Sequence, residues 1–378
     1  MIDDTTRRAW AYLSRVAEPP NPWLAQLISA VGAVEAADRI RRRDRALDEH
    51  LERSTHARHE IDCAEADLDI LDRVGGRLIT LEDDEYPRLA FTGFRQVKAK
   101  DKKPQAHPPL VLWTVGPASM IDVAERSAAL VGTRAASAYG EYVAGDLAVG
   151  LVERDVAVVS GGAYGIDGAA HRATLAADGV TVAVLACGID VPYPSGHSAL
   201  LHRISRSGLV VSEYPPGTRP TRRQFLSRNR LVAALGRATV VVEAGVRSGA
   251  ANTAAWADAL GRTVGAVPGP ITSASSVGCH ALIDGDAKVI TRAADIVELI
   301  GRMGEFAPEL ERPVSELDAL SAAELAVYEA LPRRGSRTVD EIAVAAGLPV
   351  SDVLGPLTML DVRGLVTQVD GCWKLAKR

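Results

Sequence analysis

Cysteine is rare in this sequence, and its spacing excludes two kinds of site. Cys63, Cys187, Cys279 and Cys372 are the only cysteines in 378 residues, and no two of them form a CxxC pair. This pattern argues against a disulfide framework and against a zinc site, so we expect reduced thiols with structural roles. No other pattern typical of metal ligands is evident, and we predict neither a metal nor a cofactor.

Long apolar runs and a targeting segment are also lacking. The chain starts MIDDTTRRAW, which has no apolar core of the signal-peptide kind, and no run approaches the ~18 apolar residues that a membrane span needs. We therefore expect a cytoplasmic protein with no membrane partner. Apolar residues make up 47%, charged residues 24% and aromatic residues only 4%, which is ordinary globular composition and identifies no function.

The length predicts two or three domains, because one domain typically takes ~100–200 residues. Residues 1–84 are predicted to form an N-terminal helical domain, since AWAYLSRV and PWLAQLISAVGAVEAADRI carry apolar positions at helical spacing. The stretch RRRDRALDEHLE mixes both charges, as a solvated helical face does. Residues 94–108, FRQVKAKDKKPQAHP, hold four of the seven lysines without apolar periodicity, so we expect a mobile surface loop there.

Residues 85–305 are predicted to form a core domain, and from about residue 110 short β-rich runs alternate with helical ones. The runs are AALVG, DVAVVSG, VTVAVLACG, GLVVSEYP, ATVVVEAG and RTVGAVPG, which are apolar throughout, as strands buried on both faces are. This alternation predicts an α/β fold with a Rossmann-like, doubly wound and mainly parallel sheet. Ligands of such sheets bind at the carboxyl ends of the strands, so the loops after these runs are where function is expected.

The end of the chain predicts a polar linker at 306–320 and a winged helix at 321–378. LSAAELAVYEAL opens with Ser321 and Glu324 in capping-box spacing, and TVDEIAVAAG and VSDVLGPLTMLDVRG predict two further helices. LVTQV and CWKLA, joined by an Asp-Gly pair, predict a β-hairpin.

The third helix of this winged helix is poorly suited to DNA. It carries Asp352 and Asp361 but only Arg363 as a cation, and a helix that enters the major groove needs positive charge. A protein-contact role is therefore favoured over DNA reading.

Three loops at predicted strand ends are suited to an anion. VGTRAASAYG places Arg134 beside a helix start near Ser137, where free backbone N–H groups attract negative charge. SGGAYGIDGAAH supplies Gly161 and Gly162, which let the backbone approach a ligand closely. After the fifth run, small polar groups again precede a helix: Ser248, Gly249, Asn252 and Thr253.

The second of these loops is a weak signal for a nucleotide. Its spacing is GGxxGxxG rather than GxGxxG, and the chain has no GxxxxGK[ST], so neither NAD binding nor ATP hydrolysis is favoured. Asp167 and His171 follow four residues apart on one helix face. Without a visible third ligand, the preferred interpretation is a hydrogen-bonded pair that fastens the helix to its neighbours, rather than a metal pair or an acid–base couple.

The strongest functional signal is a segment with no acidic residue, from Tyr214 through Val242. Such a concentration of guanidiniums in a chain of net charge −5 attracts a phosphate backbone through counterion release. Phe225, within the segment, offers a stacking face for an unpaired base, worth ~1–3 kcal/mol. The segment therefore predicts binding of a single-stranded nucleic acid. Its six arginines are Arg219, Arg222, Arg223, Arg228, Arg230 and Arg237.

Structural roles compete for parts of this acid-free segment. Phe225 is also compatible with a core position, and Arg228 or Arg230 with pairing to carboxylates across the sheet. We expect the SRNR stretch to be about half structural, with Asn229 stabilising a turn.

The order of motifs carries a resemblance over roughly residues 85–300. VGTR, SGGAYGIDGAAH, AVLACGIDVPYPSGH, VSEYPPGTRP, QFLSRNRLVAAL, VVVEAGVRSGAANTA and AVPGP follow one another along the chain. In this order they resemble the DNA-processing protein A family (DprA, also called Smf). Members of that family commonly carry an N-terminal helical, SAM-like domain and often a C-terminal winged helix, so the resemblance extends to both flanks.

The resemblance implies a homodimer that binds single-stranded DNA, protects incoming DNA and loads RecA onto it in natural transformation or related recombination, without catalysis. It implies that the core domain at 85–305 binds DNA, along a path through Arg134 and through Arg222 and Arg223 beside Phe225. Arg228 and Arg230 carry the family's RNR motif around Asn229. Two departures are the arginines where some members have lysine, and a basic insertion at 94–108 that is longer than expected.

Two other functions compete with this one. The Rossmann-like nucleotide phosphoribohydrolases are similar in their sheet, but they carry a PGGxGTxxE motif that is absent here. Glu243 would be the only obvious acid nearby, with no apparent partner base. A sequence-specific regulator acting through the winged helix is disfavoured by the few cations of its third helix.

Overall fold

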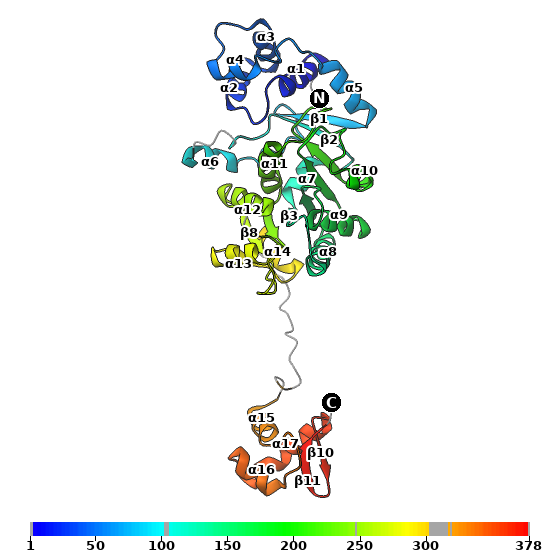
Figure 1. Cartoon of the computed structure of the whole chain (residues 1–378), viewed down its shortest axis with the longest axis vertical. Helices are drawn as coiled ribbons and strands as arrows, with labels where there is room; N and C mark the ends of the chain where they lie inside the picture. Colours follow the sequence, from blue (N-terminus) through cyan, green and yellow to red (C-terminus); the bar gives the residue numbers. More distant parts are fainter. Residues whose placement is uncertain (1–2, 102–105, 246–247, 302–316, 318–319, 377–378) are drawn as a thin grey trace. The chain divides into compact units, whose positions relative to one another are not determined.

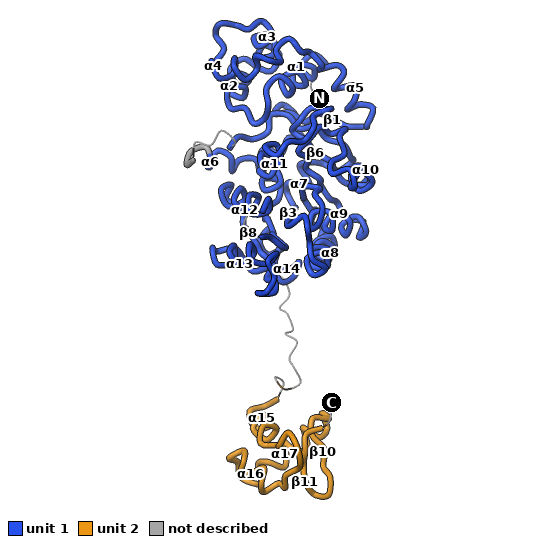
Figure 2. Tube along the Cα trace, in the orientation of Figure 1, with its two compact units in different colours: residues 1–307 blue, residues 308–378 orange. Residues whose placement is uncertain are grey.

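The computed structural model describes residues 3–101, 106–245, 248–301, 317 and 320–376. Residues 1–307 form one compact unit and residues 308–378 form another (Figure 2). Of the predicted linker at 306–320, only residues 317 and 320 are described.

A nine-stranded sheet forms the centre of the first unit (Figure 1). Its order is β1-β2-β6-β5-β4-β3-β7-β8-β9, and every pairing from β6 to β9 is parallel. At the other edge, β2 pairs antiparallel with both β6 and β1. The six predicted runs are the strands β3 to β8, which confirms the doubly wound fold. The strands are β1 (Gly76–Thr80), β2 (Val111–Val115), β3 (Ser127–Val131), β4 (Ala157–Ser160), β5 (Thr181–Leu185), β6 (Leu209–Ser212), β7 (Ala238–Val241), β8 (Thr263–Ala266) and β9 (Lys288–Val289).

Helices cover both faces of this sheet, which explains the uninterrupted apolar strands. In β3, Ala128 and Leu130 pack with the layer of α8 and α9, whereas Ala129 and Val131 pack with the layer of α11 and α12. The helices are α7 (Met120–Glu125), α8 (Ala138–Val152), α9 (Ile166–Ala176), α10 (Ser198–Ser207), α11 (Arg222–Leu235), α12 (Gly249–Ala259), α13 (Val277–Asp284) and α14 (Ala293–Ile300), with a short 3-10 turn η1 (Ser195–His197).

The chain reverses its direction of winding at β3. From β3 it proceeds through β4, β5 and β6 on one side, and it continues with β7, β8 and β9 on the other. The carboxyl ends of β3 and β7 therefore border the crevice where open parallel sheets bind their ligands.

The N-terminal helices pack directly on the edge of the sheet. They are α1 (Asp4–Val16), α2 (Pro22–Val31), α3 (Ala33–Arg42), α4 (Glu49–Thr55) and α5 (Ala64–Arg73). Trp10 and Leu13 of α1 share one buried cluster with Trp113 of β2. The prediction of a helical domain over residues 1–84 is wrong near its end, because Gly76–Thr80 is a strand that pairs with β2. The domain boundary at residue 84 remains a prediction.

The predicted surface loop at 94–108 is wrong in its first part. Gly93–Asp101 forms helix α6, because Phe94 and Val97, three residues apart, are both buried in the main core. Residues 102–105 lie outside the described part of the chain.

The second unit has the predicted winged-helix order. Helices α15 (Ala322–Glu329), α16 (Val339–Ala346) and α17 (Val350–Val362) precede a hairpin of β10 (Val366–Val369) and β11 (Cys372–Leu375). Ser321 and Glu324 form the expected capping box. Asp370 and Gly371 turn the hairpin with φ of 50° and 77°, as a tight Asp-Gly turn does.

No single described helix has both the length and the apolar composition to cross a bilayer, and only α16 and α17 taken together, bent by 104°, meet those criteria. All four cysteines are free.

Candidate nucleic-acid interface

A hollow of about 740 Å³ lies at the carboxyl edge of the sheet, where the winding reverses. The loops after β3, β4 and β7 and the first turns of α11 surround it. Sequence-distant residues predicted to bind DNA are therefore brought together here. Those that line the hollow are Arg134, Gly161, Arg222, Phe225, Arg228, Asn229, Ser248 and Gly249, whereas Gly162, Arg223, Arg230 and Asn252 are not part of its lining.

Phe225 is half-buried among three partners rather than enclosed in the core. The guanidinium carbon of Arg134 lies 5.1 Å from the centroid of its ring, and that of Arg228 lies 5.9 Å away. The ring of Tyr193 is tilted by 52° at a centroid distance of 5.4 Å. A part-exposed ring beside a cation is a platform on which an unpaired base can stack.

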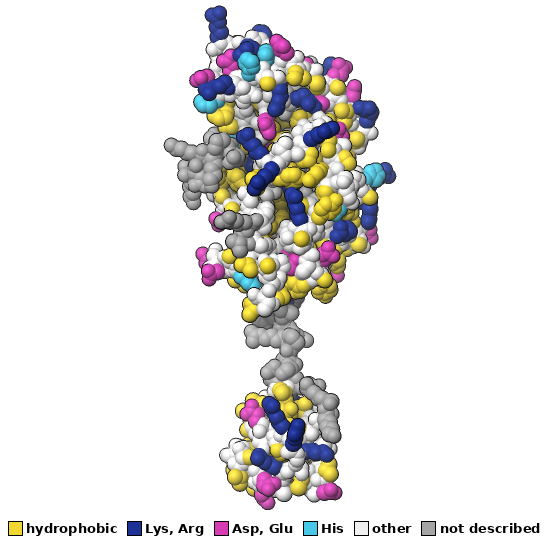
Figure 3. All heavy atoms as spheres, viewed as in Figure 1, with side chains coloured by type: hydrophobic (Ala, Val, Ile, Leu, Met, Phe, Trp, Pro, Cys, Tyr) yellow, Lys and Arg dark blue, Asp and Glu magenta, His cyan; other side chains and the backbone are white. Residues whose placement is uncertain are grey.

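Two arginines that line the hollow, and two that are close to one of them in the sequence, have no ion-pair partner among the described residues. Arg134, Arg219, Arg222 and Arg223 are exposed, and none forms an ion pair with a described residue. In Figure 3, basic side chains gather over α11 and the adjoining strands, with acidic side chains mostly around that area. Unpaired positive charge concentrated in this way raises the local attraction for phosphate groups.

The start of α11 adds to the positive potential around the hollow. Thr221 and Gln224 form a capping box, in which the Thr221 Oγ1 accepts from the Gln224 N–H and the Gln224 Oε1 accepts from the Thr221 N–H at 2.7 Å. No acidic residue follows in the first turn. The positive end of the helix dipole thus points to the same region as Arg222.

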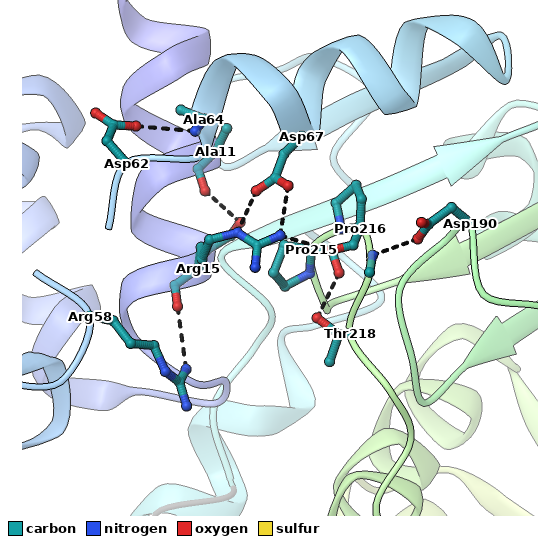
Figure 4. A network of polar contacts seen from close by, with 12 residues as sticks. Ala11, Arg15, Arg58, Asp62, Ala64, Asp67, Asp190, Pro215, Pro216 and Thr218 are labelled. Atoms are coloured by element: carbon teal, nitrogen blue, oxygen red, sulfur yellow. Dashed lines mark hydrogen bonds and ion pairs between the residues drawn. The ribbon is translucent and has the colours of Figure 1, made fainter. Parts of the chain in front are cut away.

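A network that includes the N-terminal helices holds the chain just before α11 (Figure 4). Arg15 of α1 donates to both carboxylate oxygens of Asp67 at 2.6 Å, and its Nη2 also donates to the Pro216 carbonyl at 2.7 Å. The Gly217 N–H donates to Asp190 Oδ1 at 2.7 Å. The loop that leads to Arg222 and Phe225 is thereby fastened to α1 on one side and to the loop after β5 on the other.

Arg228 is buried at the floor of the hollow. Its Nη1 donates to the Gly161 carbonyl at 2.6 Å and also to the Val184 carbonyl. Burial lowers the pKa of Arg228, and the nearby charge of Asp167 opposes that shift. A side chain at Gly161 would collide with the guanidinium of Arg228, which would have to leave its present position. Gly162 is also buried and adopts φ of 70°.

The position of Arg230 contradicts the prediction that this residue contacts DNA. Its side chain has no exposed surface, and its Nη2 donates to the two oxygens of the buried Glu213 at 2.7 and 2.8 Å. A side chain without exposed surface does not reach DNA, so we remove Arg230 from the candidate contacts. The structural alternative, pairing with a carboxylate, is the correct one here.

Asn229 has a different structural role from the predicted one. It lies inside α11 rather than in a turn, and its Nδ2 donates to the Gly249 carbonyl at 3.3 Å and to Asn252 Oδ1 at 3.2 Å. Ser248 caps α12 by accepting from the Ala251 N–H. The contacts of Asn229 join the middle of α11 to the start of α12, and Asn229, Ser248 and Gly249 all line the hollow.

Asp167 and His171 do not bond to each other as predicted. Asp167 accepts from the Gly161 and Ala163 N–H groups, and burial raises its pKa. The His171 Nδ1 bonds to the hydroxyl of Thr181 at 2.7 Å. Each side chain thus fastens α9 to a neighbouring element separately.

Glu243, the acid on which an enzyme would depend, has a structural role. It is buried, and it accepts from the N–H and the hydroxyl of Ser137 at 2.9 and 2.6 Å and from the Ser275 hydroxyl at 3.0 Å. These bonds tie the end of β7 to the start of α8, and no described histidine or lysine bonds to this carboxylate.

Tyr193 is a site residue that the sequence reasoning missed. It is 40% exposed and lines the hollow beside Phe225. The signal was present, because an aromatic residue follows the run VTVAVLACG in the loop at the carboxyl edge of the sheet.

Two family models match this chain. Residues 77–301 match the family described as DNA recombination-mediator protein A, and residues 311–371 match the DprA winged helix domain. The chain is 62% identical to the putative DNA processing protein DprA of Mycobacterium tuberculosis, over 99% of this chain and 95% of that protein. The chain belongs to the DprA family. It is also 36% identical to Protein Smf of Escherichia coli over 66% of this chain and 68% of that protein.

Two solved DprA structures are similar to this one. The X-ray structure of DprA from Streptococcus pneumoniae has a TM-score of 0.62 and 29% identity, and the match covers 82% of this chain and all of that one. DprA from Helicobacter pylori has a TM-score of 0.50 and 29% identity, with 59% of this chain and 94% of that chain covered. The H. pylori structure is described as giving insight into a unique single-stranded DNA binding mode of that protein.

Proposed function

We propose that this DprA-family protein binds single-stranded DNA in the hollow around Phe225. The observation that carries the proposal is a group of exposed arginines, without ion pairs to described residues, beside a part-exposed aromatic ring: Arg134 comes from the loop after β3 and Arg222 from the start of α11. The binding mode described for the H. pylori relative supports it.

The site favours an unpaired strand over a duplex for a chemical reason. A base stacks on Phe225 or Tyr193 only when its face is free, whereas in a duplex both faces are occupied by neighbouring base pairs. The arginines contact phosphates of either form, so they supply affinity, and the rings supply the preference for a single strand.

A role in recombination extends this proposal. The family description as a recombination mediator supports a protein that protects incoming single-stranded DNA and loads RecA onto it. We propose that it does so as a homodimer and in the cytoplasm, in natural transformation or a related process. Catalytic turnover is not part of the proposal, because Glu243 is engaged in structural hydrogen bonds.

A salt-titrated comparison of strands tests the partner class. The purified protein is titrated with oligo-dT and with a duplex of equal length from about 50 to 200 mM salt, the range in which phosphate contacts lose much of their affinity. We expect tighter binding of the single strand at every salt concentration. Equal or tighter binding of the duplex would overturn the proposal, and release of free base from nucleoside monophosphates would favour an enzyme.

A further inference from the structure

A second hollow, of about 820 Å³, runs along α10 on the face of the sheet opposite α11. It lies between α10 and the turn that joins α5 to β1. We call it the α10 groove. Its lining includes Val115 of β2, Val210 of β6 and Leu201 of α10, which form an apolar floor.

Positive charge dominates the lining of the α10 groove. Arg73 and Arg206 line it and are exposed, and neither forms an ion pair with a described residue; the exposed His202 lies on the same wall of α10. Within the described part of the chain, the Arg73 Nε donates to a backbone carbonyl, that of Asp69, at 3.2 Å. Asp190 is the one carboxylate of the lining, and its Oδ1 accepts from the Gly217 N–H. The groove is therefore complementary to an anionic ligand.

The α10 groove and the hollow around Phe225 share a wall. Pro192 lines the groove, and the next residue, Tyr193, lines the hollow. One loop, which follows β5, thus separates the two spaces. Two exposed tyrosines stand at this crossing: Tyr193 is 40% exposed, and Tyr164, whose hydroxyl accepts from the Gly196 N–H of the same loop, is 45% exposed.

We propose that the α10 groove carries the same DNA strand onward from the hollow around Phe225, across the loop after β5. The inference rests on the proposed single-strand binding and extends its footprint to the opposite face of the sheet. Arg73 and Arg206 contact phosphates, the apolar floor accepts bases, and the two tyrosines offer stacking surfaces at the crossing.

An acidic peptide would satisfy the charges of the groove but not its other features. A peptide has no need of aromatic platforms at the crossing or of continuity with a nucleic-acid site. A polynucleotide uses both, because its charge repeats along the strand and each base has a face that stacks.

The test compares a short and a long strand on the full chain. Fluorescent oligo-dT of about 6 and about 25 nucleotides are used, since an OB fold, another kind of single-strand site, takes about 4–16 nucleotides and the two lengths lie near the lower end of that range and beyond it. The double variant Arg73→Gln/Arg206→Gln is measured beside Arg203→Gln, a matched control on α10 that is exposed but does not line the groove.

We expect the short strand to bind the double variant as it binds the wild type. For the long strand, loss of two phosphate contacts should lower the salt slope by about 1.4, so that the ratio of affinities at 50 and 200 mM salt falls by about sevenfold. Arg203→Gln should leave both strands unaffected.

Three results would overturn the inference. The first is an unchanged salt slope for the long strand in the double variant, and the second is an equal decrease of that slope in Arg203→Gln. The third is that the double variant no longer binds a labelled oligo-glutamate that the wild type binds, while its DNA binding is intact. Failure of the proposed function is a separate outcome, because the wild type would then show no preference for oligo-dT of either length over duplex.

Discussion

The guanidinium of Arg134 lies over the ring of Phe225, with 5.1 Å between its carbon and the ring centroid. The first residue follows β3 and the second belongs to α11, so this contact joins two elements across the site where the sheet winding reverses. It places a cation for phosphate directly beside a ring for a base, which is the combination that an unpaired strand requires.

Loss of the ring should weaken DNA binding without loss of the fold. Phe225→Leu keeps an apolar side chain but removes the stacking surface, so the affinity for oligo-dT should fall by about 1–3 kcal/mol, or about 5- to 150-fold. Phe225→Tyr, which keeps a ring, should retain most of the affinity. Fluorescence anisotropy measures both, and equal affinity of the Leu variant and the wild type would show that Phe225 is only a packing residue.

Arg230 should matter for stability and not for DNA contact. Arg230→Met leaves Glu213 buried without its partner, so the free energy of unfolding should fall by about 3–5 kcal/mol. Urea unfolding measures this loss. In Arg230→Met/Glu213→Leu, both charges are removed, and most of the stability should return because neither ion remains unpaired. If the double variant is as unstable as the single one, the ion pair is not the reason for the loss.

The contrast between Arg222 and Arg230 shows where sequence reasoning stops. The segment from Tyr214 through Val242 was recognised as cationic because it has no acidic residue, but Glu213 lies one position before it and pairs with Arg230. Glu213 directly follows β6 and lies seventeen residues before Arg230 in the sequence. This spacing alone does not show that the two side chains meet in the fold. The sequence therefore left two alternatives open for Arg230, a DNA contact or a pair with a carboxylate, and only the structure decides for the pair.

The fold was more predictable than the side-chain contacts. Strands β3 to β8 were recognised because burial on both faces makes each run continuously apolar. Strand β9 has only two residues, both exposed, and β1 follows helices without a break in pattern, so neither produced a signal. Helix α6 was missed because Phe94 and Val97 are too few apolar positions to reveal a period.

His171 should make stability fall at mildly acidic pH. Burial lowers its pKa from 6.5 to about 3. The Thr181 hydroxyl donates to the Val158 carbonyl, so it accepts from Nδ1–H, and Nε2 has no partner among the described residues. The unfolded chain takes up a proton below pH 6.5 that the folded chain does not, and stability is lost as pH falls from 6.5 towards 3, at up to about 1.4 kcal/mol per unit.

Urea unfolding between pH 7 and pH 5 measures this contribution. His171→Gln should remove it and make the pH dependence shallower than that of the wild type, whereas the exposed His202→Gln should not. Identical pH dependence in His171→Gln and the wild type would contradict a neutral, buried His171.

The winged helix should contribute little to binding of a single strand. Its third helix, α17, carries Asp352 and Asp361 with Arg363 as its flanking cation, and we propose a protein-contact role for this unit. A chain that ends at residue 312 should therefore keep most of its affinity for oligo-dT. Loss of nearly all binding in that shortened chain would assign the DNA site to the winged helix instead.

The salt dependence of oligo-dT binding in Arg134→Ala and Arg222→Ala tests the central claim most directly. Each variant should bind more weakly than the wild type, and each should lower the slope of log affinity against log salt by about 0.7, the value of one phosphate contact on a single strand. Arg237→Ala, an exposed arginine of the same segment that does not line the hollow, serves as the control and should leave the slope unchanged. Wild-type slopes in both Arg134→Ala and Arg222→Ala would contradict a DNA path through the hollow around Phe225.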